Sequence, residues 1–176
     1  YLFMDGARLA SALTATSNDL TLGDITQLTD VFYLGGTKCG ALLGEAIVIS
    51  NDLLKTDFKY HIKQRGAMLA KGRLLGIQFH QLLQNNLIFQ LASHSNSMAA
   101  KIRFEIQNSG YSFLTQSDTN QIFPILPNTV IDKLKNKYGF FVWQTVDNFS
   151  SAIRIITSWA TPEQKVDQFI HDLTKS

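Results

Sequence analysis

Residues 31–40 read Val-Phe-Tyr-Leu-Gly-Gly-Thr-Lys-Cys-Gly, a short apolar run that is closed by two glycines and followed by a lysine. Residues 1–6, Tyr-Leu-Phe-Met-Asp-Gly, repeat the pattern with an acid at the end of the run. Neither run alternates polar and apolar side chains, which is typical of strands covered on both faces of a sheet. A third such run spans residues 46–50. The first part of the chain is therefore predicted to hold an α/β layer.

Turn and capping signals predict the remaining elements. They are helices at 6–16, 25–29, 53–85, 87–107, 128–137 and 162–173, strands at 111–114 and 122–126, and a hairpin of strands 140–145 and 151–157. The predicted N-caps are Asp24, Asn128 and Thr161. A stripe of leucines is expected to be buried along residues 53–85 (Leu69, Leu74, Leu75, Leu82 and Leu83). This pattern divides the chain into residues 1–86 and a smaller α+β domain, 87–176, with a mostly antiparallel sheet.

The composition argues against several classes of function. The net charge of +2 is too small to indicate binding to nucleic acid or to a membrane surface, and no run of about 18 apolar residues exists. The single cysteine, Cys39, allows no internal disulfide and favours a reducing, cytoplasmic compartment. The four histidines lack metal-ligand spacing, so no metal site is expected. Because the chain starts at Tyr1, inside an apolar run and without methionine, we expect it to be a piece of a longer protein.

Asp5 and Lys38 follow two apolar strands and lie 33 positions apart, a separation that suits one strand–helix–strand unit. The carboxyl ends of such strands are where α/β sheets bind ligands. A lysine beside glycines can act as a Schiff-base amine, and an acid opposite it can keep a pyridine nitrogen protonated. Together the two residues are what a pyridoxal-phosphate (PLP) site requires. Singly, Asp5 also fits an ordinary turn and Lys38 an exposed surface lysine.

Four segments of the chain resemble the threonine aldolase family and its relatives, the aromatic amino acid β-eliminating lyases. They are MDGARL at 4–9, GGTKCGALLGE at 35–45, KQRGAMLAKGR at 63–73 and IRIITSW at 153–159. Thr37 departs from the serine that more familiar members carry before their lysine. The resemblance implies an α/β fold, the C-terminal part of a fold-type-I PLP enzyme. Residues 1–86 would be a remnant of the PLP-binding large domain with its sheet, and 87–176 the small C-terminal α+β domain.

The resemblance also implies roles for individual residues. Lys38 would be catalytic and would hold the cofactor, while Asp5 would pair with the pyridine nitrogen. Arg154 would bind the substrate carboxylate as a two-pronged donor, and Arg8 would assist beside that carboxylate or the cofactor. Arg154 alternates with two isoleucines and so points to the other face of its strand, where an ordinary outward-facing residue is the alternative.

A basic group lies in residues 63–73 and consists of Lys63, Arg65, Lys71 and Arg73. It fits a solvated helix surface. The resemblance instead favours Lys63 or Arg65 as contacts to the cofactor phosphate of a neighbouring subunit, in a homodimer or homotetramer.

The implied reaction is the cleavage of a β-hydroxy amino acid, such as threonine, to glycine and an aldehyde by a PLP-dependent carbon–carbon lyase. No residue of the chain is a good candidate for the general base, so the chain alone is expected to be inactive. Two alternatives remain open. One is another fold-type-I PLP enzyme, such as a β-eliminating lyase of amino acids. The other is a non-catalytic structural or interaction domain.

Overall fold

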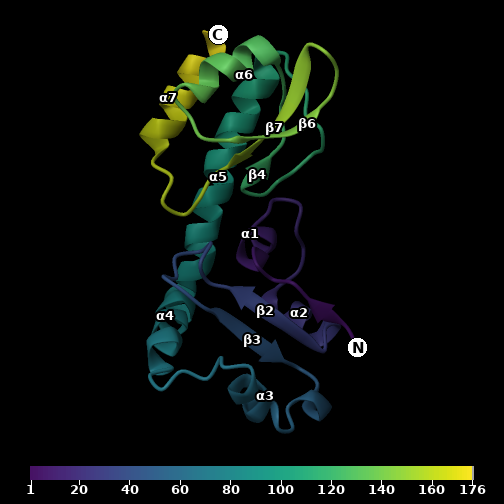
Figure 1. Cartoon of the computed structure of the whole chain (residues 1–176), viewed down its shortest axis with the longest axis vertical. Helices are drawn as coiled ribbons and strands as arrows, with labels where there is room; N and C mark the ends of the chain where they lie inside the picture. The colour runs from purple at the N-terminus through teal and green to yellow at the C-terminus, as the bar shows by residue number, and fades with distance from the viewer. Residues whose placement is uncertain (176) are drawn as a thin grey trace. The chain divides into compact units, whose positions relative to one another are not determined.

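The computed structural model describes residues 1–175, which form two compact units (Figure 1). The first unit holds Tyr1–Leu13 and Asn18–Leu91, and the second holds Thr14–Ser17 and the chain from Ala92 onward. Both units combine helices with strands, as the sequence predicted. Among the helices of residues 1–175, none combines the length and apolar character needed to cross a membrane.

The first unit is built on a three-stranded sheet in the order β1–β2–β3. Strand β1 (Phe3–Met4) runs parallel to β2 (Val31–Gly35), and Met4 lies opposite Phe32. Strand β3 (Glu45–Ile49) lies antiparallel on the other side of β2. The parallel pairing confirms that residues 5 and 38 follow neighbouring strands at the same edge of the sheet, where side chains from both can meet.

Two helices connect β1 to β2: α1 (Leu9–Leu13), which is shorter than predicted, and α2 (Leu22–Leu28). The prediction of Asp24 as the N-cap of α2 is wrong, because Thr21 occupies that position. The Thr21 hydroxyl accepts from Asp24 N at 3.2 Å, and the Asp24 carboxylate accepts from Thr21 N at 2.7 Å. This reciprocal capping box satisfies two backbone donors that the first turn leaves free.

The single helix predicted over residues 53–85 is also wrong. The structure has a 3-10 turn η1 (Asp52–Leu54), then α3 (Phe58–Gln64) and α4 (Arg73–Leu83). Two residues in the left-handed conformation interrupt the path, Asp57 at φ 58° before α3 and Gly66 at φ 71° after it. The predicted buried stripe fails with the helix, since several of its members are exposed (Leu69, Leu74 and Leu83).

The second unit is centred on strand β7 (Ser150–Ile156). It pairs antiparallel with each of its neighbours, β4 (Gln121–Ile122), β5 (Ile125–Pro127) and β6 (Phe141–Thr145). The mostly antiparallel sheet and the hairpin of β6 and β7 were both predicted correctly. The helices are α5 (Leu87–Asn108), which follows the 3-10 turn η2 (Gln84–Asn86) and contains the boundary between the units, α6 (Asn128–Lys135) and α7 (Glu163–Thr174).

One apolar core joins α5, α6 and α7 to this sheet. Ile153 and Ile155 of β7 are buried in it, at 0% and 8% exposure. Arg154 stands between them and is only partly buried, which confirms that it points to the opposite face of the strand. The face that carries Arg154 is therefore the one that the helices leave uncovered.

Several predicted boundaries in the second unit are wrong for local reasons. Residues 111–114 form no strand and contribute one isolated bridge, from Phe113 to Pro124. Pro124 lacks a backbone N–H and divides the predicted strand 122–126 into β4 and β5. Prolines also occupy the N-cap positions expected for Asn128 and Thr161. The Thr161 hydroxyl instead accepts from Ser158 N at 2.8 Å, in the preceding turn.

Candidate active site

Two glycines bring the ends of β1 and β2 into direct backbone contact. Gly35 N donates to Gly6 O at 2.9 Å. A Cβ added at Gly6 would lie 1.7 Å from Tyr33 O, and one added at Gly35 would lie 2.3 Å from Ala7 O. Neither position has room for a side chain, so the glycines hold the residues that follow both strands in one small region.

Asp5 extends from the end of β1 into this region, and its side chain is exposed. Its Oδ1 accepts from Ala7 N at 3.0 Å and from the Tyr33 hydroxyl. Mainly because of the Tyr33 bond, and then the Ala7 bond, the pKa of Asp5 lies below its ordinary value of 3.8; the positive charge of Lys38 lowers it further. Asp5 is therefore a carboxylate at neutral pH, and within residues 1–175 its Oδ2 has no hydrogen-bond donor.

Tyr33 is the partner of Asp5 that the sequence analysis missed. The shared hydrogen bond raises the pKa of Tyr33 to about 12, so its hydroxyl keeps its proton and acts as a donor. The register of the sheet places the two residues together, because Met4 pairs with Phe32 and the next position on each strand follows. An aromatic residue within the apolar run of β2 gave no signal of this role before the register was known.

Lys38 lies in a tight turn that directly follows β2, and its side chain is exposed. Cys39 N and Ala41 N both donate to Gly36 O, at 2.9 and 3.0 Å. Gly36 N donates to Glu45 Oε2 at 3.0 Å, so the first residue of β3 fixes the start of this turn. A Cβ at Gly36 would lie 2.7 Å from Gly44 O, which makes glycine necessary there. The structure thus presents the Lys38 amine from a rigid backbone.

Arg8 and Cys39 form the inner side of this region. Arg8 is partly buried, and its Nε is buried without a hydrogen-bond partner among residues 1–175. Cys39 is 1% exposed, and burial raises the pKa of its thiol even though the charges of Arg8 and Lys38 oppose that shift. A buried, protonated thiol is a poor nucleophile, so Cys39 is a packing residue of this turn.

The structure does not bring Lys63 and Arg65 to these residues. Both are exposed at the C-terminal end of α3. Within the described chain, no hydrogen bond or ion pair links either side chain to Asp5, Lys38 or Arg8. The contact predicted for Lys63 or Arg65 is to a neighbouring subunit. Their exposure within this chain does not test it, and it stays a prediction.

Arg154 belongs to the second unit, where β6 provides its surroundings. It pairs across the ladder with Phe141, and its guanidinium carbon lies 5.4 Å from the centroid of the Phe141 ring and 5.3 Å from that of Trp143. Its side chain lines a pocket of about 480 Å³ together with Gly139, Phe140 and Ile156. Arg154 is therefore a cation held by aromatic rings at the edge of an open pocket.

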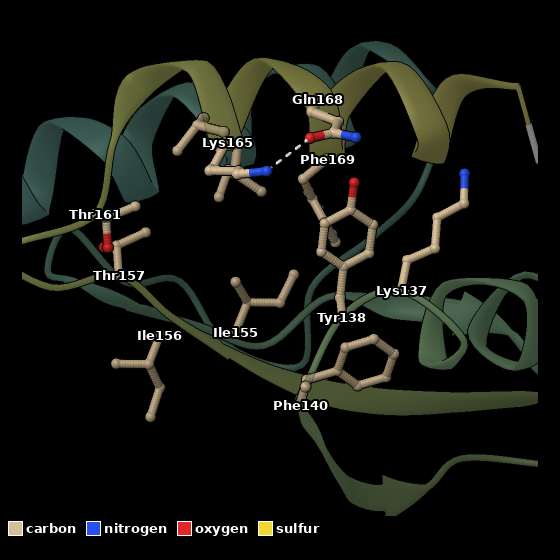
Figure 2. Close-up of a pocket in the computed structure, with 13 residues that line it drawn as sticks. Lys137, Tyr138, Phe140, Ile155, Ile156, Thr157, Thr161, Lys165, Gln168 and Phe169 are labelled. Atoms are coloured by element: carbon tan, nitrogen blue, oxygen red, sulfur yellow. Dashed lines mark hydrogen bonds between the residues drawn. The ribbon is translucent and has the colours of Figure 1, made fainter.

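A second pocket in this unit, of about 550 Å³, contains none of the predicted site residues (Figure 2). Its floor is apolar and includes Ile155 and Phe169. Its lysines already have partners, since Lys137 pairs with Asp172 at 3.1 Å and Lys165 donates to Gln168 Oε1 at 3.2 Å. Across residues 1–175, no group of three or more His, Cys, Asp or Glu side chains is arranged to hold a metal ion.

Comparison with known proteins indicates the fold class of the chain. No protein-family profile matches the chain. An ornithine aminotransferase from Plasmodium yoelii matches in structure with a TM-score of 0.54 at 15% identity, over 98% of this chain and 46% of that one. At that identity the likeness concerns the fold alone, which is that of the fold-type-I PLP enzymes.

Two further matches are more specific. A low specificity L-threonine aldolase from a Pseudomonas species is 31% identical over 176 residues, which cover 98% of this chain and 49% of that protein. A threonine aldolase from Leishmania major matches with a TM-score of 0.96 at 48% identity, over 99% of this chain and 51% of that one. The chain is similar to the C-terminal half of threonine aldolases and spans about half the length of the curated relatives it matches.

The residues at the edge of β1 and β2 fit the cofactor of that class. A pyridinium N–H needs an ionised acceptor with a free lone pair, and Asp5 Oδ2 offers one on a carboxylate with a lowered pKa. The cofactor aldehyde needs an accessible amine, and Lys38 is exposed on the neighbouring strand end. The buried Arg8 Nε is a further donor without a partner in the described residues.

Proposed function

We propose that the protein containing this chain is a PLP-dependent lyase that cleaves a β-hydroxy amino acid, threonine above all, to glycine and an aldehyde. The observation that carries the proposal is the parallel pairing of β1 with β2. That pairing sets an ionised Asp5 beside the turn of Lys38, within a family of threonine aldolases. An acid and an amine on adjacent strand ends are the two protein groups that this cofactor chemistry needs first.

Each residue of the first unit has a defined task in this proposal. When bound, PLP supplies an electron sink that weakens the bond between Cα and Cβ of the amino acid. Lys38 holds the cofactor through its amino group. Asp5 accepts the N–H of the pyridine ring and keeps that proton in place, which its low pKa permits at neutral pH. Tyr33 and Ala7 hold the Asp5 carboxylate in position, and Arg8 donates to the cofactor or the substrate carboxylate.

In the second unit, Arg154 binds the substrate carboxylate. A guanidinium donates two parallel N–H bonds to a carboxylate, which fixes the direction of the substrate as well as its charge. Orientation matters in this reaction, because a substrate held in one direction presents its reacting bond in a productive geometry. An arginine with no carboxylate partner among residues 1–175 is available for that task.

The proposal extends to assembly and setting. We assign residues 1–86 to the PLP-binding large domain and residues 87–176 to the small domain. In a homodimer or homotetramer, Lys63 or Arg65 contacts the cofactor phosphate of a neighbouring subunit, which their exposure on α3 supports. A cytoplasmic location fits a single cysteine that is buried as a free thiol.

The test is product analysis with L-threonine. It uses the natural protein, meaning the protein that contains this chain, supplied with PLP. We expect glycine and acetaldehyde, and no detectable turnover after Lys38→Ala. Lys55→Ala removes an exposed lysine of the same unit and should leave the rate unchanged. Pyruvate and ammonia in place of glycine would identify a β-eliminating lyase, and the absence of any cofactor absorbance would identify a non-catalytic domain. The 176 residues alone should show no turnover.

A further inference from the structure

The surroundings of Arg154 are aromatic where an arginine usually has acidic partners. Its guanidinium carbon lies within 5.4 Å of the centroids of two rings, those of Phe141 and Trp143. Attraction between a cation and a ring face operates within about 6 Å of the centroid, and tryptophan is its strongest partner. Both rings are largely exposed, at 67% for Phe141 and 53% for Trp143, so the core does not account for them.

No polar group competes with the rings for Arg154. Its Nε is buried and has no hydrogen-bond partner among residues 1–175, and no carboxylate of that range pairs with it. Arg154 is partly buried, and a cation that is partly shielded from water gains more from a ring than a fully exposed cation does. The rings are thus the interactions that hold the side chain, and the N–H donors at the edge of the guanidinium remain free.

The hairpin is shaped so that both rings reach the same arginine. Phe141 is the direct ladder partner of Arg154. The register then shifts between Val142 and Gln144, which leaves Trp143 as the extra residue of a β-bulge. Bulges redirect a side chain, and here the Trp143 ring lies over Arg154 and also meets Phe123 edge to face, with the ring centroids 5.2 Å apart. The Phe123 ring therefore helps to hold the Trp143 ring in place.

We propose that Trp143 and Phe141 are positioning residues that hold the Arg154 guanidinium by its faces and leave its N–H edge free for the carboxylate of the substrate. This inference rests on the proposed role of Arg154 in binding that carboxylate. It assigns to β6 a function in substrate affinity, although neither ring needs to touch the reacting atoms. The consequence is that loss of the ring should weaken binding of the amino acid while the chemical step proceeds at its normal rate.

The test compares four variants of the natural protein with PLP and L-threonine. Arg154→Met removes the proposed carboxylate ligand, Trp143→Leu removes one ring, and Trp143→Phe keeps a ring in its place. Phe149→Leu is the matched control, because Phe149 is an exposed aromatic of the same hairpin and, in the described structure, contacts neither Arg154 nor another ring. For Trp143→Leu we expect KM to rise about tenfold with kcat within about twofold of the parent. Trp143→Phe should recover most of the affinity, and Phe149→Leu should match the parent.

The outcomes separate the two claims. If Arg154→Met raises KM strongly and Trp143→Leu does not, the positioning role is overturned while the proposed function stands. An equal rise in KM for Trp143→Leu and Trp143→Phe, or a fall confined to kcat, would overturn it as well. If Arg154→Met leaves KM unchanged, the carboxylate role fails and this inference fails with it.

A second readout requires no turnover. The 176 residues contain two tryptophans, so in this chain on its own Trp159→Phe leaves Trp143 as the single fluorescent indole. Adding Arg154→Met to that variant removes the cation from the ring, and we expect the emission of Trp143 to change. Superimposable emission spectra would contradict the contact itself.

Discussion

The edge of β1 and β2 and the hairpin of β6 and β7 prepare a charged side chain in opposite ways. Asp5 is held by hydrogen bonds, since Ala7 N and the Tyr33 hydroxyl both donate to one of its oxygens. Arg154 is held by ring faces and has no polar partner for Nε in residues 1–175. In both places one set of contacts fixes the group and leaves another part of it free, which is the Oδ2 atom in Asp5 and the N–H edge in Arg154.

The difference follows from what each group is proposed to bind. An acceptor for a pyridinium proton has to stay ionised, and hydrogen bonds from neutral donors lower its pKa without neutralising its charge. A donor to a carboxylate has to avoid other anions, and an aromatic ring attracts the cation without offering an acid that would compete. Polar contacts therefore suit the Asp5 carboxylate, and aromatic contacts suit the Arg154 guanidinium.

The largest expected effect is on the backbone contact between the ends of β1 and β2. Gly6→Ala places a Cβ 1.7 Å from Tyr33 O, so the strand ends must separate, and we expect a loss of about 3 kcal/mol in the free energy of unfolding. Gly76→Ala is the control, since Gly76 lies inside α4 with no atom within 4 Å of the added Cβ. It should stabilise the protein by about 1 kcal/mol. Urea denaturation of both variants measures the difference; equal stability would refute the tight contact.

The next effect concerns the hairpin. Arg154→Lys keeps the charge but removes the planar fork, so two parallel bonds to a carboxylate are no longer possible. We expect KM for L-threonine to rise at least about tenfold, which corresponds to about 1.4 kcal/mol. Arg73→Lys, at an exposed position on α4, should leave KM unchanged. A lysine variant with the KM of the parent would mean that charge alone serves at this position.

The smallest effect concerns the pKa of Asp5. Tyr33→Phe removes the hydrogen bond that contributes most to its lowering, so the pKa of Asp5 should rise toward its ordinary value of 3.8. A lowered pKa stabilises the fold at pH above the unfolded value and loses that contribution as pH falls through the folded value. As pH falls, the stabilising contribution of Asp5 should therefore be lost at a higher pH in the variant than in the parent.

Carboxyl NMR titration of Asp5 measures this shift, with Tyr60→Phe on the exposed surface of α3 as the control. In the parent, the raised pKa of Tyr33 contributes stability that is complete below the unfolded value of about 10 and is lost as pH rises through about 12. An Asp5 pKa that is the same in Tyr33→Phe and in the parent would show that Ala7 and Lys38 are sufficient.

Much of the edge formed by β1 and β2 could be predicted, because its sequence signals are local. Unbroken apolar runs marked β1 and β2, and glycines marked their ends, so the neighbouring positions of Asp5 and Lys38 followed from the order of elements. Two hydrogen bonds could not be predicted, because they depend on the strand register. They are the bond from the Tyr33 hydroxyl to Asp5 and the bond from Gly36 N to Glu45. The register is set by packing across the sheet and not by any one stretch of sequence.

The errors have more than one origin. A 53–85 helix was predicted from leucine spacing, but left-handed residues at Asp57 and Gly66 interrupt it. The alternation of Arg154 with buried isoleucines was enough to orient it correctly. Its contact with Trp143 was out of reach, because it depends on a bulge in the opposite strand that no local pattern reveals. For the Trp143 contact, the missing information was the geometry between strands and not the type of residue.

The most direct test of the central claim is chemical trapping of the cofactor on the natural protein. The PLP-loaded protein is reduced with borohydride, digested, and mapped by mass spectrometry. The account predicts that the pyridoxyl mass is found on the peptide that contains Lys38, and that it disappears in Lys38→Arg. A label on any other lysine of the chain, with Lys38 unmodified, would contradict it.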